Sequence, residues 1–365
     1  AAVSGVRRTG GCLRRMKVAV GISGGVDSAV AALLLKEQGH EVVGVTMTLG
    51  RADEAKSLAE AKAAAERLDI PLKVFDFSRE WNSHVLQYLR NVYLGGQTPN
   101  PCVRCNETVK FGLLPQAAFE MGCEKFATGH YARILIKHRD TESQSGRFNS
   151  VPLCLCVKNV QLLRAADRSK DQSYFLYRVR PEILERTIFP LGEMTKDEVR
   201  AKARAFGLEV AEKGDSQDFC GGDPMRIVNE PDREGEVVTV AGKVIGRHRG
   251  YWNYTVGMRK GLGIGGGTPY YVVALDAAEN RVIVGFKENA VRREFKMVDR
   301  VGFLTSGEDA ASPLRVKVRS AGEPKGPVTV EGDMVFCPEG IAGIAPGQSA
   351  VFYDGDVVVG GGIIV

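Results

Sequence analysis

The chain alternates short apolar runs with longer segments in which apolar residues recur every three or four positions. Short runs rich in β-branched residues predict buried strands, and the longer periodic segments predict helices. The predicted strands in the first third of the chain cover residues 17–22, 41–47, 71–77 and 125–130. The predicted helices between them start at Asp27, which could cap the first one, and then cover 51–68, 81–93 and a stretch that follows a loop at 95–106 and ends near Met121. This alternation indicates an α/β fold with a doubly wound parallel sheet.

The pattern changes further along the chain. Residues 138–149 are polar and irregular and predict an exposed loop, whereas 170–179 and 195–208 predict helices. After about residue 222 we expect hairpins, among them 235–246 around Ala241-Gly242 and 350–365 around Asp354-Gly355. We therefore expect four parts, which are a basic leader at 1–15, an α/β domain at 16–222, a small β-rich linking domain at 223–286 and a C-terminal β-barrel at 287–365.

Composition narrows the class of protein. The 365 residues are 44% hydrophobic and 25% charged, which is typical of a globular protein, and a net charge of +5 does not by itself require nucleic acid. We expect no secretory signal and no membrane segment, so the eight cysteines predict a reducing compartment. The expected location is the cytoplasm. An organelle matrix is the alternative, because the leader with its four arginines and no acidic residue could be the remnant of a transit peptide.

One loop carries a chemical signal. Residues 21–28, GISGGVDS, follow the first predicted strand and open the first predicted helix. A glycine pair in this place lets backbone N–H groups approach an anion, and the helix N-terminus adds positive charge. The familiar P-loop lysine is missing, and Asp27 fits an anion site only if Mg²⁺ lies between its carboxylate and the phosphates. The alternative is an ordinary turn between strand and helix.

Further motifs extend the signal along the chain. These are TPNPCVRCNETVKF, ATGHYA, KDQSYFL, GDSQDFCG, GMRKGLGIGG and PGQSAVFYDGDVVVGGG. Together with the loop at 21–28, they resemble the tRNA-specific 2-thiouridylases of the PP-loop ATP-pyrophosphatase superfamily, from about Met16 to the C-terminus. The resemblance implies that ATP is cleaved between its α- and β-phosphates, that the 2-oxygen of the wobble uridine is adenylated, and that sulfur replaces this oxygen. It implies tRNA as a partner, together with a sulfur-donor protein or a persulfide relay.

The resemblance also implies roles for single residues. Cys220 would carry a persulfide, Cys105 would be the partner nucleophile, and Asp27 and His130 would assist the reaction. Cys102 departs from the aspartate found in many members of the family. Three alternatives stay open: a [4Fe–4S] cluster on Cys102, Cys105 and Cys220 that carries the sulfur, a small-molecule amide-forming synthetase that uses the same loop, and an RNA-binding module with a vestigial nucleotide site. Three thiolates without a fourth ligand argue against structural zinc.

Binding residues follow from the same resemblance. The expected ATP contacts are Gly21, Ile22, Ser23, Gly24, Gly25, Val26, Asp27, Ser28, Met47 and Gly129. The expected contacts with tRNA or its target base are Asn100, Pro101, Cys102, Lys170, Asp171, Gln172, Arg319, Ser320 and Gln348. From the residues alone, we expect a phosphate-binding face formed by Arg247, Arg249, Arg259, Lys260, Lys317 and Arg319. The remaining cysteines are interpreted as core residues (Cys123, Cys154, Cys156 and Cys337) or as part of the leader (Cys12).

Overall fold

The structure is a computed structural model that describes residues 14–51, 54–136, 160–208, 224–265, 268–302 and 313–365. Several sequence-based expectations lie outside these ranges. They concern most of the basic leader, the loop at 138–149, and the cysteines Cys12, Cys154, Cys156 and Cys220. Within the described residues, no helix is both long enough and apolar enough to cross a membrane.

The first half of the chain is built on a five-stranded parallel sheet. Its strands, in the order β3-β2-β1-β4-β7, are β3 (Leu72–Asp76), β2 (Glu41–Thr48), β1 (Lys17–Gly21), β4 (Lys125–Ala127) and β7 (Thr187–Ile188). Every neighbouring pair is parallel, which confirms the predicted fold class. The strand order reverses at β1, because β2 and β3 lie on one side of it and β4 on the other. In such sheets a ligand binds where the order reverses, beyond the carboxyl ends of the strands.

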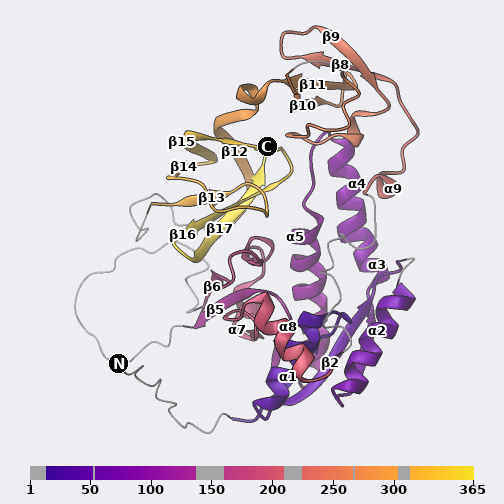
Figure 1. The fold of residues 1–365 in the computed structure, drawn as a ribbon, viewed down its shortest axis with the longest axis vertical. Helices are drawn as coiled ribbons and strands as arrows, with labels where there is room; N and C mark the ends of the chain where they lie inside the picture. Colours follow the sequence, from indigo (N-terminus) through magenta and orange to yellow (C-terminus); the bar gives the residue numbers. More distant parts are fainter. Residues whose placement is uncertain (1–13, 52–53, 137–159, 209–223, 266–267, 303–312) are drawn as a thin grey trace, which may run out of the picture.

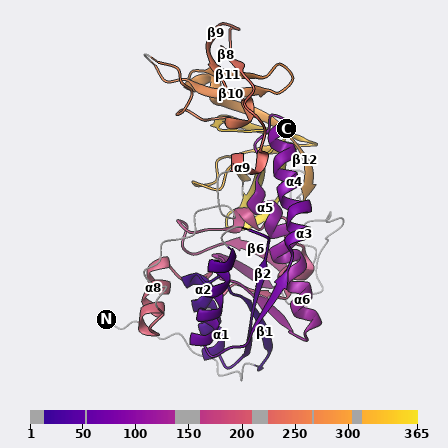
Figure 2. The ribbon, with the colours of Figure 1, turned by 90° about the vertical axis from the view of Figure 1, so that its right-hand side faces the viewer.

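Helices cover both faces of this sheet (Figures 1 and 2). On one face, Val18 and Val20 of β1 pack against three helices, α1 (Val26–Glu37), α2 (Glu54–Arg67) and α8 (Lys196–Ala205). On the other face, Ala19 packs with the π-helical segment η2 (Asn106–Leu113) and with α6 (Leu114–Glu120). Successive residues of β1 thus face opposite sides, as the two-residue period of a strand requires.

A long helical segment begins after β3. It consists of α3 (Ser78–Trp81), a π-helical stretch (Asn82–Leu86) and α4 (Gln87–Leu94). The loop predicted at 95–106 is wrong in its second half, because α5 begins at Pro101 and ends at Cys105. The Asn100 side chain accepts a hydrogen bond from the Val103 N–H at 3.3 Å, and Pro101 occupies the first turn, where its missing N–H has no cost.

The helix predicted at 170–179 is also wrong. Only a 3₁₀ turn (Ser173–Phe175) forms there, and the next helix is α7 (Pro181–Glu185). The reason is that the Asp171 side chain accepts hydrogen bonds from the Ser173 and Ala165 N–H groups, both at 3.1 Å, which holds the chain in a turn. The helix predicted at 195–208 is confirmed as α8, with a capping box between Thr195 and Glu198.

The middle of the chain forms a separate four-stranded sheet. Its strands, in the order β10-β11-β8-β9, are β10 (Tyr271–Asp276), β11 (Arg281–Gly285), β8 (Gly235–Thr239) and β9 (Val244–His248), so the hairpin predicted at 235–246 is confirmed. Three short helices accompany this sheet, which are α9 (Pro224–Val228) and the 3₁₀ turns Tyr251–Asn253 and Lys287–Ala290. Leu89 of α4 is buried among Val237, Val272 and Trp252. The long helix therefore joins this sheet to the first domain, as Figure 1 shows.

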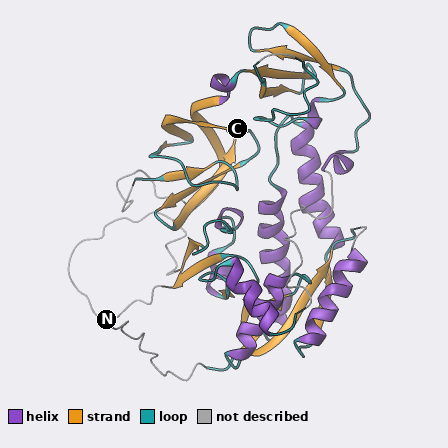
Figure 3. Cartoon of the chain, viewed as in Figure 1, coloured by secondary structure: helices purple, strands orange, loops and turns teal. Residues whose placement is uncertain are grey.

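The C-terminal part is an antiparallel, barrel-like sheet, whose strands are orange in Figure 3. Its strands are β12 (Val291–Val301), β13 (Arg315–Lys317), β14 (Thr329–Glu331), β15 (Met334–Ala342), β16 (Ser349–Asp354) and β17 (Val357–Ile364). The predicted turn at Asp354-Gly355 is confirmed between β16 and β17. A hairpin that we did not predict, β5 (Ala132–Ile136) and β6 (Val160–Arg164), extends the sheet through the pairing of Leu163 with Val357. The first half of the chain and the barrel therefore share a sheet.

Candidate active site

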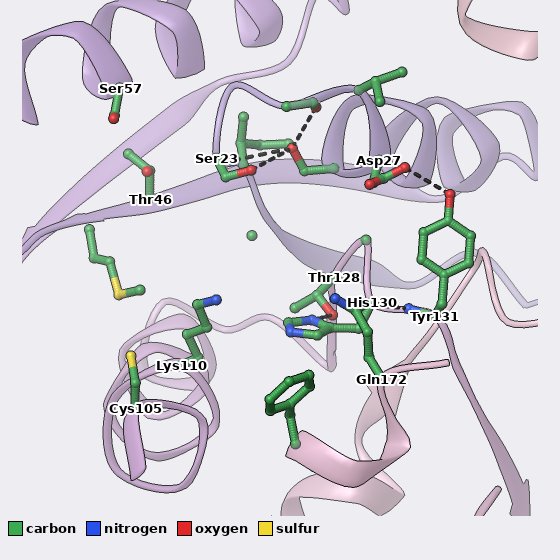
Figure 4. A pocket seen from close by; sticks show the side chains of 18 of the residues that line it. Ser23, Asp27, Thr46, Ser57, Cys105, Lys110, Thr128, His130, Tyr131 and Gln172 are labelled. Carbon is green, nitrogen blue, oxygen red and sulfur yellow. Dashed lines mark hydrogen bonds between the residues drawn. The ribbon is translucent and has the colours of Figure 1, made fainter. Parts of the chain in front are cut away.

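A cavity of about 950 Å³ lies at the carboxyl ends of the parallel strands, where the strand order reverses. Figure 4 shows Ser23 and Asp27 on one side of it and Cys105 and Lys110 on the opposite side. Many predicted site residues line this one cavity: Gly21, Ile22, Ser23, Gly25, Val26, Asp27, Ser28, Met47, Cys105, Gly129, His130, Lys170, Asp171, Gln172 and Ser320. Six predicted residues of the described ranges are not among its lining: Gly24, Asn100, Pro101, Cys102, Arg319 and Gln348. Cys220 lies outside the described ranges.

The glycine loop, residues 21–28, is held by its own side chains. The Ser28 hydroxyl accepts a hydrogen bond from the Ser23 N–H at 3.2 Å and donates one to the Gly25 carbonyl at 3.0 Å. Gly25 is the N-cap of α1 and has no side chain to cap it, so the prediction that Asp27 caps this helix is wrong. The N–H groups in the first turn of α1 consequently keep their capacity to bind an anion.

Asp27 instead forms a partly buried ion pair that we did not predict. Both of its carboxylate oxygens lie 2.8 Å from Lys196 Nζ, and Oδ1 accepts a hydrogen bond from the Tyr131 hydroxyl, also at 2.8 Å (Figure 4). Lys196 is the first residue of α8, and its side chain is only 7% exposed. A buried cation at a helix N-terminus opposes the helix dipole and needs a compensating anion. The sequence TKDEV already places Lys196 in the first turn of a predicted helix, where a cation is unfavourable. This unfavourable position could have indicated Lys196 as a functional residue.

Gly129 packs directly against the glycine loop. A Cβ atom at this position would lie 2.6 Å from the Asp27 carbonyl carbon and 2.7 Å from the Ser28 nitrogen. Only glycine allows this approach, which brings the chain after β4 into contact with the chain after β1. This contact forms the floor of the cavity.

His130 lies at this floor in its neutral form. Its Nδ1 is 2.9 Å from the Thr128 hydroxyl, and its ring packs against Phe111 and Phe189, with centroids 5.4 and 6.3 Å away. His130 contributes to the lining of the cavity, but its side chain is largely buried. Burial lowers the pKa of His130 to about 3, and the nearby positive charge of Lys110 acts in the same direction. At neutral pH this side chain can therefore exchange hydrogen bonds, but it does not act as an imidazolium acid.

Cys105 is on a helix rather than in the loop that we predicted. The Cys105 side chain is nearly buried and packs with Leu49, Val85 and Val109. Cys105 also contributes to the lining of the cavity. The π-helical segment η2 begins directly after it. Because hydrogen bonds in a π-helix connect residues five apart, Cys105 and Lys110 project from the same side, and Figure 4 shows both directed toward the cavity. Cys102 is half-buried, one turn earlier.

The far wall combines two distant parts of the chain. Lys170, Asp171 and Gln172 line it from the first domain, and Ser320 and Ala321 line it from the barrel. Gln172 is tied to the floor, because its Oε1 accepts a hydrogen bond from the Tyr131 N–H at 2.9 Å and its own N–H donates to the Tyr131 carbonyl at 2.8 Å. The cavity is therefore completed only when the barrel is in place.

Asn100 and Gln348 have structural contacts beside the cavity. Gln348 Nε2 donates to the carbonyls of Thr98 and Pro99, at 3.2 and 2.9 Å, and the Thr98 N–H donates to the Pro346 carbonyl at 2.7 Å. Asn100 caps α5 and donates to the Tyr174 hydroxyl at 3.3 Å. The barrel thus holds the residues that precede the Cys105 helix.

Of the remaining sequence-based expectations, some are wrong and some are confirmed. Lys317 is wrongly assigned to an exposed basic face, because it is buried and burial lowers its pKa. Cys123 and Cys337 are confirmed as buried residues, and burial raises the pKa of both thiols. Among the described residues, no group of three His, Cys, Asp or Glu side chains is arranged to bind a metal ion. The alternative iron–sulfur cluster includes Cys220, which lies outside those residues.

Comparison with known proteins finds a match for each of the three domains. Family models match residues 16–221 (tRNA methyl transferase HUP domain), 228–286 (tRNA methyl transferase PRC-barrel domain) and 294–364 (Aminomethyltransferase beta-barrel domain). The tRNA-specific 2-thiouridylase MnmA of Trichormus variabilis is 42% identical over 364 residues, which cover 95% of this chain and 98% of that protein. The one from Synechocystis is 44% identical over 370 residues, which cover 95% and 96%. The chain therefore belongs to the family of tRNA-specific 2-thiouridylases.

Proposed function

We propose that this chain uses ATP to replace the 2-oxygen of the wobble uridine of tRNA with sulfur. The observation that carries the proposal is the single cavity bordered by the glycine loop, by Cys105 and by barrel residue Ser320. One nucleotide bound in this cavity would then contact the adenylation site, a thiol and a surface from a second domain. Membership in the family supports the same reaction.

The first step would take place at the glycine loop. The N–H groups of the loop and of the first turn of α1 bind the phosphates, and Lys196 adds a positive charge beside Asp27. The uracil 2-oxygen attacks the α-phosphorus, the bond between the α- and β-phosphates breaks, and pyrophosphate leaves. Mg²⁺ arrives with ATP as part of the substrate and neutralises phosphate charge, and Asp27 is the carboxylate of the loop that would hold it. Met47, which lines the cavity at the end of β2, would contact the adenine.

The second step would exchange oxygen for sulfur. The terminal sulfur of a persulfide on Cys220 attacks C2 of the adenylated base. The Cys105 thiolate attacks Cys220 Sγ, the sulfur–sulfur bond breaks, and its electron pair stays with the sulfur on C2, which expels AMP. The products are 2-thiouridine, AMP and a disulfide between Cys105 and Cys220, which an external thiol then reduces. Neutral His130 would orient the base by a hydrogen bond.

The partners follow from this chemistry. The anticodon region of tRNA would contact Lys170, Gln172, Arg319 and Ser320, and residues 100–102 would lie close to the target base. A sulfur-donor protein or persulfide relay would load Cys220. The reaction would take place where thiols stay reduced, in the cytoplasm or an organelle matrix.

A reconstituted reaction tests this proposal. The purified chain is incubated with unmodified tRNA, ATP, and cysteine plus a cysteine desulfurase, and nucleosides and pyrophosphate are measured. We expect one pyrophosphate per 2-thiouridine and no pyrophosphate without tRNA. Pyrophosphate release that depends on a free small acid instead of tRNA would contradict the proposal and favour an amide-forming synthetase.

A further inference from the structure

Arg164 is a buried cation that neither reaction step uses. It is the last residue of β6, next to Leu163, which pairs with barrel strand β17. Its side chain is 7% exposed and forms two ion pairs, with Asp171 (Nε to Oδ2, 3.3 Å) and with Glu323 of the barrel (Nη2 to Oε2, 2.8 Å). A guanidinium placed between two carboxylates joins the segments that carry them.

The first of these segments leads to the glycine loop. The Asp171 carboxylate, 1% exposed, also accepts hydrogen bonds from Ala165 and Ser173. The next residue, Gln172, is bound to the backbone of Tyr131, whose hydroxyl donates to Asp27. Figure 4 shows this last part of the path, from Gln172 through Tyr131 to Asp27. A continuous series of contacts and peptide bonds therefore runs from Arg164 to the anion-binding loop.

The second segment leads to the barrel side of the cavity. Glu323 follows Ser320 and Ala321, the two barrel residues that line the cavity. The Glu323 side chain is 61% exposed, and its pair with the buried Arg164 ties an exposed turn of the barrel to the first domain. Lys170 to Gln172 and Ser320 to Ala321 thus form one wall with Arg164 behind it.

We infer that Arg164 is a positioning residue that holds this two-part wall together and couples occupation of the wall by tRNA to the glycine loop. The inference rests on the proposed function, because it takes the wall to be in contact with tRNA. It predicts that tRNA and ATP bind with positive coupling. A tRNA that presses on residues 170–172 and 320–321 favours the arrangement in which Tyr131 and Lys196 hold Asp27 in place, and by reciprocity ATP favours tRNA binding.

The chain offers a matched control for this clamp. Arg168 also joins the first domain to the barrel, since its Nη2 lies 2.6 and 2.7 Å from the two carboxylate oxygens of Asp356. Asp356 is bound by Arg133 as well, at 2.7 Å. Neither Arg168 nor Asp356 lines the cavity. Loss of the Arg168 pair therefore removes a more exposed arginine–carboxylate ion pair between the same domains, at residues that do not line the cavity.

The experiment measures binding of a non-hydrolysable ATP analogue with and without unmodified tRNA, together with KM and kcat for tRNA. The variants are Arg164→Gln, Arg164→Lys, Glu323→Gln and, as control, Arg168→Gln. Glu323→Gln changes an exposed side chain and leaves Arg164 paired with Asp171, so it remains informative if Arg164→Gln fails to fold. Thermal unfolding of each variant reports folding.

We expect tRNA to tighten binding of the analogue by about 5- to 10-fold in the unmodified chain. Glu323→Gln and Arg164→Gln should lose this tightening and raise KM for tRNA about 10-fold, with a smaller change in kcat. Arg164→Lys should retain part of the tightening by tRNA, and Arg168→Gln should retain all of it. Full coupling in Glu323→Gln, equal losses in Glu323→Gln and Arg168→Gln, or no coupling in the unmodified chain would overturn the inference. Absence of tRNA binding and thiolation in the unmodified chain would instead contradict the proposed function.

Discussion

The two sides of the cavity differ in chemical character. The glycine-loop side is polar, with N–H groups of α1 that no side chain caps, the serine hydroxyls and the Asp27–Lys196 pair. On the Cys105 side the thiol packs among apolar side chains, with Lys110 as the nearby cation on the same helix. Phosphate chemistry needs fixed dipoles and charges, whereas a sulfur nucleophile is protected where water is excluded. Under the proposed function, this difference predicts that adenylation and sulfur transfer take place at opposite sides of one nucleotide and can be disabled separately.

The largest expected effect is on the polar side. Lys196→Met should reduce tRNA-dependent pyrophosphate release by about 10²- to 10³-fold, because a preorganised charge beside the phosphates is lost and Asp27 is left unpaired. Pyrophosphate is measured under single-turnover conditions. Lys202→Met is the control, since Lys202 lies on the same helix and pairs with Glu37 at 2.7 Å near the surface. Equal rates in the two variants would show that the buried pair has no part in adenylation.

The next largest effect is expected where the barrel contacts the residues that precede the Cys105 helix. Gly347 has φ +88°, and a Cβ atom there would lie 2.7 Å from the Thr98 carbonyl oxygen. Gly347→Ala should destabilise the fold by about 1–3 kcal/mol in urea unfolding and lower thiouridine yield more than pyrophosphate release. Gly343→Ala is the matched control, because Gly343 has a similar φ of +79° but no atom of the described residues lies within 4 Å of the position of an added Cβ. If both variants behave alike, backbone strain and not the contact with Thr98 explains the loss.

A smaller effect is expected at the floor between the two sides. Folding lowers the pKa of His130 from its ordinary value near 6.5 to about 3, so below pH 6.5 the unfolded chain takes up a proton that the folded chain does not. Stability should therefore fall as pH decreases from 7 to 5, and His130→Gln should reduce this fall. Thermal unfolding at both pH values tests it, with exposed His84→Gln as control. An unchanged fall in His130→Gln would mean that His130 is charged in the folded chain.

The smallest effect is expected at Cys102. Cys102→Asp should keep thiouridine yield within about twofold under aerobic conditions with an iron-selective chelator that leaves Mg²⁺ free, because the persulfide route needs only Cys105 and Cys220. Iron and acid-labile sulfide are measured in anaerobically purified protein as the companion observation. Stoichiometric iron together with loss of activity in the variant would favour the cluster alternative.

The sequence predicted what depends on local pattern. The parallel strands, α8 and the two late hairpins follow from periodicity and turn residues, and the glycine loop follows from its motif. Sequence reasoning failed at one local competition and at distant contacts. The Asp171 side chain accepts a hydrogen bond from the nearby Ser173 N–H and fixes a turn where residue preferences favour a helix. Lys196 reaches Asp27 from a position 169 residues away. It also missed the β5–β6 hairpin, because the barrel strand that completes its pairing lies nearly 200 residues later in the chain.

Uncoupling the two steps tests the central claim most directly. Cys105→Ser keeps the shape of the side chain but removes the thiol, and it leaves the glycine loop, Lys196 and Asp27 unchanged. Single-turnover reactions with unmodified tRNA should release pyrophosphate at close to the normal rate and form no 2-thiouridine. Normal formation of 2-thiouridine, or loss of pyrophosphate release in a folded variant, would contradict a cavity with separate phosphate and sulfur sides.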